Sequence, residues 1–360
     1  MIGIYIHVPF CRTLCPYCDF NRVRIDGAPP EAYIDALVTE IEAFDGRETA
    51  ETVFIGGGTP SLLTPGQLER ILQAVGKHFR LPETPEITIE ANPDDVTAGL
   101  ADAWRDAGVN RASLGVQSFD DAVLEYLGRR HDAVTARAAC EIVARRFGNW
   151  SMDLIYGAPP AASWGATLAE CAALGPPHVS CYGLTYEPGT PFGARADEAI
   201  DDDLALECYR SCHEVLSDYD RYEVSNFAKL GYQCRHNLYY WHNLEYAGFG
   251  PGAYSFVNGI RSMNEASPDA YMKHPGRKAE AAQLSDREVR VETLIQHFRL
   301  REGLGQQAYS DRFARDLDDD FGPVLKALVS RGLLEKSDGR YRPTALGFEL
   351  NNEIGLALVD

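Results

Sequence analysis

Residues 5–21 read Tyr-Ile-His-Val-Pro-Phe-Cys-Arg-Thr-Leu-Cys-Pro-Tyr-Cys-Asp-Phe-Asn, and the interpretation of the whole chain starts from this stretch. Its cysteines, Cys11, Cys15 and Cys18, follow a short apolar run with the spacing C-x3-C-x2-C. Three thiolates so close in sequence can converge on one metal centre if the loop curls around it. Four cysteine ligands suit structural zinc or an electron-transfer cluster, whereas three leave one coordination position open. On a [4Fe–4S] cluster, one iron would then lack a protein ligand; a zinc site is the alternative.

The overall composition is typical of a soluble globular protein. The 360 residues are enough for one large domain of about 200–250 residues and a smaller second domain. Hydrophobic residues make up 45% and charged residues 24% of the chain, which are ordinary fractions. The N-terminus lacks a basic region, and no window approaches about 18 uninterrupted apolar residues. We therefore expect no signal peptide, no transmembrane helix and a cytoplasmic location.

Charge and cysteine content narrow the classes of function. The chain carries 53 acidic against 34 basic side chains, which gives a net charge of −19. Because binding to a phosphate backbone needs clustered Lys and Arg, we expect no nucleic-acid partner, while peripheral contact with a membrane surface stays open. Nine cysteines, an odd number at uneven spacing, indicate metal ligands and buried thiols rather than a disulfide framework.

Up to about residue 185, short β-branched runs alternate with longer amphipathic segments. Six consecutive βα units imply a parallel sheet, and right-handed crossovers allow this sheet to curl. The predicted fold class is therefore α/β, a partial (β/α)6 barrel of the TIM type. The expected strands are 2–7, 52–56, 86–91, 111–116, 151–156 and 178–184, and the expected helices are 30–44, 65–79, 97–107, 120–127, 133–146 and 163–174.

Polar and glycine residues follow these strands at the end of the barrel where reacting groups are usually found. Three glycines before Thr59 would let the backbone approach a ligand closely. Glu90 closes the apolar run of the third strand, Gln117 follows the fourth, and Asp153 lies on the fifth between apolar neighbours. Arg129 comes twelve residues after Gln117. Each feature alone is more often structural, as a tight turn or a salt bridge within the barrel. Together, beside a thiolate loop, they are better explained by one large polar ligand.

The series of motifs resembles the radical S-adenosylmethionine (SAM) superfamily. The motifs are Tyr-x-His-x-Pro-Phe-Cys, Gly-Gly-Gly-Thr-Pro-Ser, Glu-Ala-Asn-Pro, Gly-Val-Gln-Ser-Phe and Asp-Leu-Ile-Tyr-Gly. The resemblance implies that the three cysteines hold a [4Fe–4S] cluster whose open iron binds SAM. It also assigns the SAM contacts: Tyr5 near the cluster, Gly57, Gly58 and Thr59 at the methionyl end, and Glu90, Gln117, Arg129 and Asp153 at the carboxylate and ribose. The planar fork of an arginine suits a carboxylate.

Within that superfamily, the motifs resemble the branch that contains oxygen-independent coproporphyrinogen III oxidases and HemW heme chaperones. The oxidase pattern continues to a fourth cysteine two residues after the third, where this chain has Phe20. The oxidases also carry an N-terminal extension, whereas the first strand expected here starts at residue 2. Both differences resemble the chaperones. An oxidase that decarboxylates porphyrinogen propionates is the alternative, and a zinc-binding regulatory protein is a third class.

Residues 236–241, His-Asn-Leu-Tyr-Tyr-Trp, resemble the H-N-x-x-Y-W motif of the heme chaperones. A neutral imidazole is a good axial iron ligand, and aromatic neighbours can pack on a porphyrin, so His236 is the candidate heme ligand. The alternative is a hydrogen-bonded histidine beside aromatics that fill a domain interface. Cys234 and His242 are further candidates. The resemblance implies two partners, a heme-acceptor protein and an electron donor for the cluster, which the sequence does not name.

We expect three parts in the chain. Residues 1–220 form the barrel with the cluster loop, and residues 221–283 form a connecting segment with a glycine-rich loop at 248–255 that resembles a segment closing the barrel mouth. Residues 284–360 form a smaller α+β domain, in which helices precede a turn at Ser337-Asp338-Gly339 between short strands. This order is typical of a winged-helix domain. The segment resembles the C-terminal domain of the HemN family, and the acidic balance favours a cover or partner surface.

Overall fold

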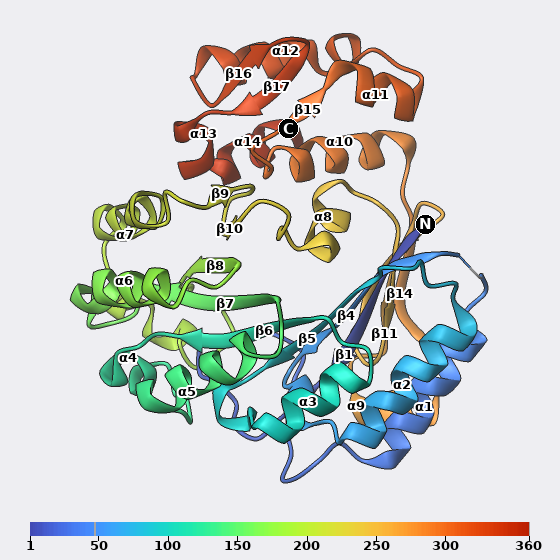
Figure 1. Ribbon diagram of the computed structural model, residues 1–360. Helices are drawn as coiled ribbons and strands as arrows, with labels where there is room; N and C mark the ends of the chain where they lie inside the picture. The colour runs from blue at the N-terminus through green and yellow to red at the C-terminus, as the bar shows by residue number, and fades with distance from the viewer. Residues whose placement is uncertain (47, 360) are drawn as a thin grey trace.

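A curved parallel sheet forms the centre of the computed structural model, which describes residues 1–46 and 48–359 (Figure 1). Six strands lie side by side in chain order, each parallel to the next, so the predicted partial barrel is confirmed. The predicted strand ends agree with the structure to within two residues. The strands are β1 (Ile2–Val8), β4 (Ala50–Gly57), β5 (Glu86–Ala91), β6 (Arg111–Gln117), β7 (Asn149–Tyr156) and β8 (His178–Gly183).

Helices cover the outer face of this sheet, and side-chain caps fix where several of them begin. Thr64 and Gln67 form a reciprocal capping box before Pro65, the first residue of α2. Asp132 caps α5, and Asp201 caps α7. None of the helices in the described ranges is long and apolar enough to cross a membrane. The helices are α1 (Glu31–Ala43), α2 (Pro65–His78), α3 (Ala98–Asp106), α4 (Asp121–Tyr126), α5 (Ala133–Ala144), α6 (Trp164–Leu174) and α7 (Asp202–Val215).

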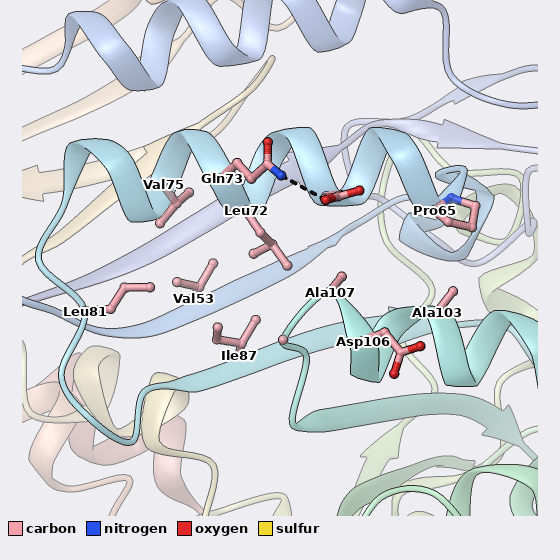
Figure 2. Close-up of a pocket in the computed structure, with 12 residues that line it drawn as sticks. Val53, Pro65, Leu72, Gln73, Val75, Leu81, Ile87, Ala103, Asp106 and Ala107 are labelled. Carbon is pink, nitrogen blue, oxygen red and sulfur yellow. Dashed lines mark hydrogen bonds between the residues drawn. The ribbon is translucent and has the colours of Figure 1, made fainter.

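A cavity of about 590 Å³ lies in this outer layer, where α2 and α3 pass over β4 and β5 (Figure 2). Aliphatic side chains such as Val53, Leu72 and Ile87 line it, and Gln73 donates a hydrogen bond to the Glu69 carboxylate at its edge. No cysteine or histidine lines it among the described residues. The cavity is therefore separate from the predicted site.

The sheet continues past the barrel at both edges, which the sequence did not predict. The predicted glycine-rich loop is partly wrong, because its first residues belong to a strand that pairs in parallel with β1. Gly248 is required in this strand, since a Cβ there would collide with the backbone carbonyl of Tyr254. Segment 221–283 thus adds strands to the sheet of the barrel. The added strands are β11 (Tyr246–Phe249), β12 (Tyr254–Val257), β13 (Ile260–Asn264) and β14 (Lys278–Gln283) beside β1, and β10 (Asn226–Ala228) and β9 (Asp220–Arg221) beside β8.

The C-terminal segment has a hydrophobic core of its own, formed by residues from Val291 to Leu358. It contains the predicted helices and hairpin around a three-stranded antiparallel sheet, while its assignment to the winged-helix class stays a prediction. Figure 1 shows α8 (Arg235–Trp241) between this domain and the barrel. The elements are α10 (Asp286–His297), β15 (Leu304–Gly305), α11 (Gln306–Phe313), α12 (Leu317–Ser330), β16 (Leu334–Ser337), β17 (Arg340–Pro343), α13 (Ala345–Glu349) and α14 (Asn351–Val359).

Glu40 on α1 connects the barrel to the added strands. Its buried carboxylate accepts hydrogen bonds from the Asn264 amide at 2.7 Å, the Gly250 backbone N–H at 2.9 Å and the Tyr271 hydroxyl at 2.6 Å. Burial raises the pKa of this carboxyl group, and the three donors oppose that change. One side chain thus satisfies three polar groups that come from different parts of the segment after the barrel.

Replacing Glu40 with alanine should lower the free energy of unfolding by about 3 kcal/mol, because three buried donors lose their acceptor. Urea denaturation followed by circular dichroism measures this change. The control is Glu42→Ala on the same helix, whose carboxylate makes an exposed ion pair with Lys77 at 3.2 Å and should cost less than about 1 kcal/mol. Equal losses in both variants would contradict the role given to Glu40.

Candidate metal and cofactor site

The cysteine loop leaves the carboxyl end of β1 and is closed by a short parallel pair of strands. After Pro9, β2 (Phe10–Cys11) pairs with β3 (Val23–Arg24), and the Val23 N–H donates to the Pro9 carbonyl at 2.7 Å. Cys15 and Cys18 lie in the loop between these strands, where the Cys18 N–H donates to the Cys15 carbonyl at 3.2 Å. The tight turn and the closed base direct all three thiols into one cavity.

This thiol-lined cavity has a volume of about 380 Å³ and lies at the carboxyl ends of the barrel strands. Its size falls in the range of about 300–1,000 Å³ that is usual for pockets that enclose a small molecule. The structure brings ten of the twelve predicted site residues to its walls. These are Cys11, Cys15, Cys18, Gly57, Gly58, Thr59, Glu90, Gln117, Arg129 and Asp153.

The glycine run positions the cysteine loop as well as lining the cavity. A Cβ on Gly58 would lie 2.8 Å from the Pro9 carbonyl carbon and 2.9 Å from the Phe10 carbonyl oxygen. The Gly58 N–H donates to Val8 at 2.7 Å, and the Gly57 N–H donates to the Glu90 carboxylate at 3.0 Å. Both amide protons are therefore already used within the protein. Glycine is needed here because β4 must approach the chain that leads into Cys11.

Arg129 is held as a fixed positive charge beside the thiols. Its Nη2 donates to the Asn92 side chain and to the Gly115 carbonyl at 2.9 Å. Its Nη1 lies 3.5 Å from the sulfur of Cys15 and 3.4 Å from the hydroxyl of Tyr17. A guanidinium in this position stabilises thiolates and leaves the two longer contacts open to exchange for a ligand carboxylate.

Two carboxyl groups lie in the interior wall of the cavity. Burial and, to a smaller extent, the charge of Asp153 raise the pKa of Glu90 to about 8, although the hydrogen bond from the Gly57 N–H opposes this change. Burial also raises the pKa of Asp153, while the hydroxyls of Ser113 and Ser151 donate to its carboxylate. At neutral pH, Glu90 is therefore mainly protonated and can donate a hydrogen bond, whereas Asp153 is a hydrogen-bonded acceptor.

Sequence reasoning missed several residues that complete this cavity. The Asn92 side chain forms hydrogen bonds with both Arg129 and Thr59. The sequence could have indicated this residue, because it belongs to the Glu-Ala-Asn-Pro motif. Arg22 donates to the Cys15 carbonyl at 2.7 Å and so fixes the loop from within. Tyr182 lies on the last barrel strand, where no motif marks it. Such contacts depend on how the loop folds back, which residue spacing does not reveal.

Tyr5 and His236 lie outside the thiol-lined cavity. Both line a smaller cavity inside the barrel, where the Tyr5 ring stacks on Phe54 and on His236. The Tyr5 hydroxyl and His7 Nδ1 share a hydrogen bond of 3.0 Å. Tyr5 therefore supports the wall behind Glu90 in this structure, and a direct contact with SAM stays a prediction.

His236 is fully engaged by its neighbours. Only 1% of the residue is exposed, Nδ1 lies 2.8 Å from the Thr52 hydroxyl, and Nε2 lies 2.9 Å from the Tyr240 hydroxyl. Burial lowers its pKa to about 3, and the charge of Arg111 adds to this effect. This is the arrangement of a hydrogen-bonded histidine. Heme ligation by His236 would require breaking one of these two hydrogen bonds and opening the enclosed region.

The two further candidate ligands differ in access. Cys234 is completely buried, with its sulfur 3.7 Å from the Glu86 carboxylate. The His242 side chain is 31% exposed, with Nδ1 3.4 Å from Nε2 of His297 and Nε2 3.7 Å from the Glu302 carboxylate. His242 therefore presents a ring nitrogen near the surface, between α8 and the C-terminal domain.

A [4Fe–4S] cluster and SAM fit the residues of the thiol-lined cavity. Of the described residues that line it, three are cysteines, and Phe20 stands two residues after the third. Thr59 donates to Cys11 at 3.4 Å, which opposes the rise that burial causes in the pKa of this thiol. One guanidinium and two carboxyl groups match the carboxylate, the ammonium group and the ribose hydroxyls of SAM.

Two family models match the chain, and similar proteins cover it from end to end. The radical SAM superfamily model matches residues 5–161, and the HemN C-terminal domain model matches residues 284–350. The heme chaperone HemW of Lactococcus lactis subsp. lactis is 34% identical over 366 residues, which cover 97% of this chain and 95% of that protein. The protein of the same name from Escherichia coli K12 is 34% identical over 379 residues, which cover 100% and 98%.

A solved structure resembles the fold over nearly the whole length. Coproporphyrinogen III oxidase (HemN) from Escherichia coli matches 99% of this chain and 89% of its own, with a TM-score of 0.85 and 23% sequence identity. At this identity the likeness shows the fold alone. Fold, thiol-lined cavity and family model define the class as a radical SAM protein. Within this class, the chain belongs to the heme chaperone HemW family.

The raised pKa of Glu90 predicts a pH dependence of stability. Its pKa is about 8 in the folded protein against 4.5 ordinarily, so its stabilising contribution is complete below pH 4.5 and is lost as the pH rises through 8. In protein without added cofactor, Glu90 should lower the free energy of unfolding of the wild type by up to about 1.4 kcal/mol for each pH unit in this range. Glu90→Gln should lack this fall, because glutamine does not titrate. Urea denaturation of both proteins between pH 5.5 and 8.5 measures the difference. Parallel pH profiles would contradict the assignment.

Proposed function

We propose that this protein is a heme chaperone of the HemW type, which binds heme and passes it to an acceptor protein. It would carry a SAM-coordinated [4Fe–4S] cluster in the thiol-lined cavity. The observation that carries the proposal is the 34% identity with HemW proteins over nearly the full length, together with Phe20 at the position of the oxidase's fourth cysteine. The proposed partners are the heme-acceptor protein and an electron donor for the cluster.

Cys11, Cys15 and Cys18 would hold the cluster, with one iron left for SAM. Bound together, the cluster and SAM would supply one-electron chemistry. The chain's own residues prepare the site: Arg129 places a positive charge beside Cys15, and Thr59 donates to Cys11. The hydrogen bond from Thr59 favours the Cys11 thiolate and so opposes burial, which raises the pKa of this thiol.

SAM would lie along the ends of β4 to β7. Thr59 and the neighbouring glycines would lie at its methionyl end, Arg129 at its carboxylate, and Asp153 at its ribose, with Glu90 and Gln117 between them. Gln117 has a positive φ of 67°, a conformation uncommon outside glycine, which turns its side chain toward the cavity rim. Support for this placement is the convergence of these residues on one cavity of suitable size.

The heme would dock outside this cavity. His236, which the motif predicts as the ligand, lies in the barrel interior with both ring nitrogens bonded. His242, one residue after the motif, has a partly exposed ring and lines a surface hollow of about 200 Å³ beside Leu300 and Glu302. Because heme iron needs a ring nitrogen that it can reach, His242 is the ligand to test first.

Loss of one thiolate should remove the cluster. Cys15→Ser leaves two thiolates and should retain far less iron and sulfide than the wild type after anaerobic reconstitution, as quantified chemically. The control is Cys140→Ala, which removes a buried thiol on α5 outside the loop and should retain full iron content. A near-wild-type iron content in Cys15→Ser would contradict the assignment of the three cysteines as cluster ligands.

Loss of one charge at the cavity should weaken SAM binding and spare the cluster. Asp153→Ala and Arg129→Ala each remove a charge-assisted contact, which corresponds to about 1.5–3 kcal/mol or roughly tenfold to hundredfold in affinity. Calorimetry on reconstituted protein measures the binding, with the exposed Asp106→Asn as the control. Unchanged affinity in both cavity variants would mean that these groups are structural.

The heme proposal separates a chaperone from an oxidase. The reconstituted protein should bind one heme per chain and should leave coproporphyrinogen III unchanged under reducing conditions with SAM. His242→Ala should weaken or shift the heme absorption band, while His236→Ala should leave it in place, because His236 is enclosed. Visible spectroscopy and product analysis provide both readouts. Turnover of coproporphyrinogen III by a fully loaded protein would overturn the chaperone assignment.

A further inference from the structure

A second, smaller cavity lies inside the barrel beside the thiol-lined one. Its volume is about 160 Å³, and it shares the wall residues Glu90, Ser113, Asp153 and Tyr182 with the larger cavity. The rest of its wall comes from the opposite ends of the strands and from α8. We call it the inner chamber. The wall residues not shared are Tyr5, Phe54, Arg111, His178, Ser180, His236, Asn237 and Tyr240.

The inner chamber contains an arginine without a partner. Arg111, at the start of β6, is only 2% exposed, and its Nε has no hydrogen-bond partner. No hydrogen bond or salt bridge of its guanidinium is present within residues 1–46 and 48–359. A guanidinium carries five N–H donors and does not lose its proton in proteins. A buried cation in this state calls for an acceptor that the chain itself does not provide.

Three acids interact electrostatically with Arg111, and two of them, Glu86 and Asp153, are committed to other groups. Glu86 accepts the backbone N–H groups of Arg235 at 3.1 Å and His236 at 3.0 Å. Asp153 accepts the hydroxyls of Ser113 at 3.0 Å and Ser151 at 3.3 Å. Among residues 1–46 and 48–359, neither carboxylate forms a salt bridge with the Arg111 guanidinium. Both acids moderate the charge of Arg111 without occupying its donors.

The other walls add donors and no further full charge at neutral pH. Burial lowers the pKa of His178 and of His236, so both rings are neutral. Glu90, with a pKa of about 8, is mainly protonated. Asn237 contributes an amide, and Tyr240 contributes a hydroxyl that also meets His236. An oxyanion in the chamber would therefore find donors around it and one carboxylate, Asp153, that is already hydrogen-bonded.

The size of the chamber limits the ligand. A single water needs only about 10–15 Å³ of such volume, so the chamber is several times larger than a water site. It is also smaller than the pockets of about 300 Å³ and more that hold drug-sized molecules, so it cannot enclose a porphyrin. A group of a few non-hydrogen atoms matches this volume. The planar fork of an arginine pairs best with the two oxygens of a carboxylate.

We propose that the inner chamber binds the carboxylate group of a small molecule on Arg111, next to the SAM cavity. In this arrangement, His236, Asn237 and Tyr240 of the H-N-x-x-Y-W segment form a wall of a small-ligand site. The ligand would lie beside Asp153 and Glu90, within reach of whatever occupies the larger cavity. A simple carboxylate and an amino acid share the required chemistry, and an ammonium group on the ligand would face Asp153.

Equilibrium dialysis of the anaerobically reconstituted protein with radiolabelled acetate and, separately, glycine tests the proposal. We expect saturable binding of one molecule per chain, with acetate alone marking a simple carboxylate site and tighter glycine binding marking an amino acid site. Arg111→Gln should lower the affinity at least tenfold. Asn237→Asp, which keeps the side-chain shape but adds a negative charge, should do the same.

Matched controls make the result decisive. Arg105→Gln removes an exposed arginine on α3 and should leave binding unchanged. Circular dichroism and heme binding report whether each variant is folded, and heme binding outside the barrel should persist in Asn237→Asp. If Arg111→Gln does not fold, the wild type and Asn237→Asp still decide the outcome. Absence of saturable binding in the folded wild type, or equal binding in folded Asn237→Asp, overturns the proposal.

Discussion

The close approach of two backbones at the ends of β1 and β4 is the constraint on which the site depends. Gly58 has no side chain, and its amide donates to Val8, so β4 lies directly against the chain that enters Cys11. Any Cβ at this position would push the cysteine loop away from the barrel. The loop can then direct three thiols into the same cavity as Glu90 and Asp153. The geometry of the proposed cluster site therefore rests on a backbone contact rather than on the cysteines alone.

Buried polar groups are the second organising feature. In most proteins, charges are excluded from the interior unless they are paired and hydrogen-bonded. This barrel encloses Glu90, Asp153, Arg129 and Arg111, and it satisfies three of them with serine, backbone or asparagine partners. Arg111 is the exception. Enclosing these groups costs desolvation free energy. Bound ligands would offset this cost, because they would supply hydrogen-bond partners that the chain itself does not provide.

The sequence predicted the barrel well because each strand and helix is encoded locally. The sequence pattern located the six barrel strands to within two residues but did not predict the short pair β2 and β3. The motifs converge on one cavity because parallel strands end on the same side. The sequence predicted less well those features that depend on contacts between residues far apart in the chain. The strands beside β1 depend on Gly248 facing Tyr254, and the environment of His236 depends on Thr52, which is 184 residues away in sequence. Motif spacing carries no information on such contacts.

Electron paramagnetic resonance of the reduced, reconstituted protein tests the central claim most directly, namely that three thiolates leave one iron open to SAM. We predict a [4Fe–4S]⁺ signal that changes in g-values or line shape when SAM is added. The same addition to Asp153→Ala should require a higher SAM concentration for the change. A cluster signal that saturating SAM leaves unaltered in the wild type, or bound zinc in place of iron, would contradict the account.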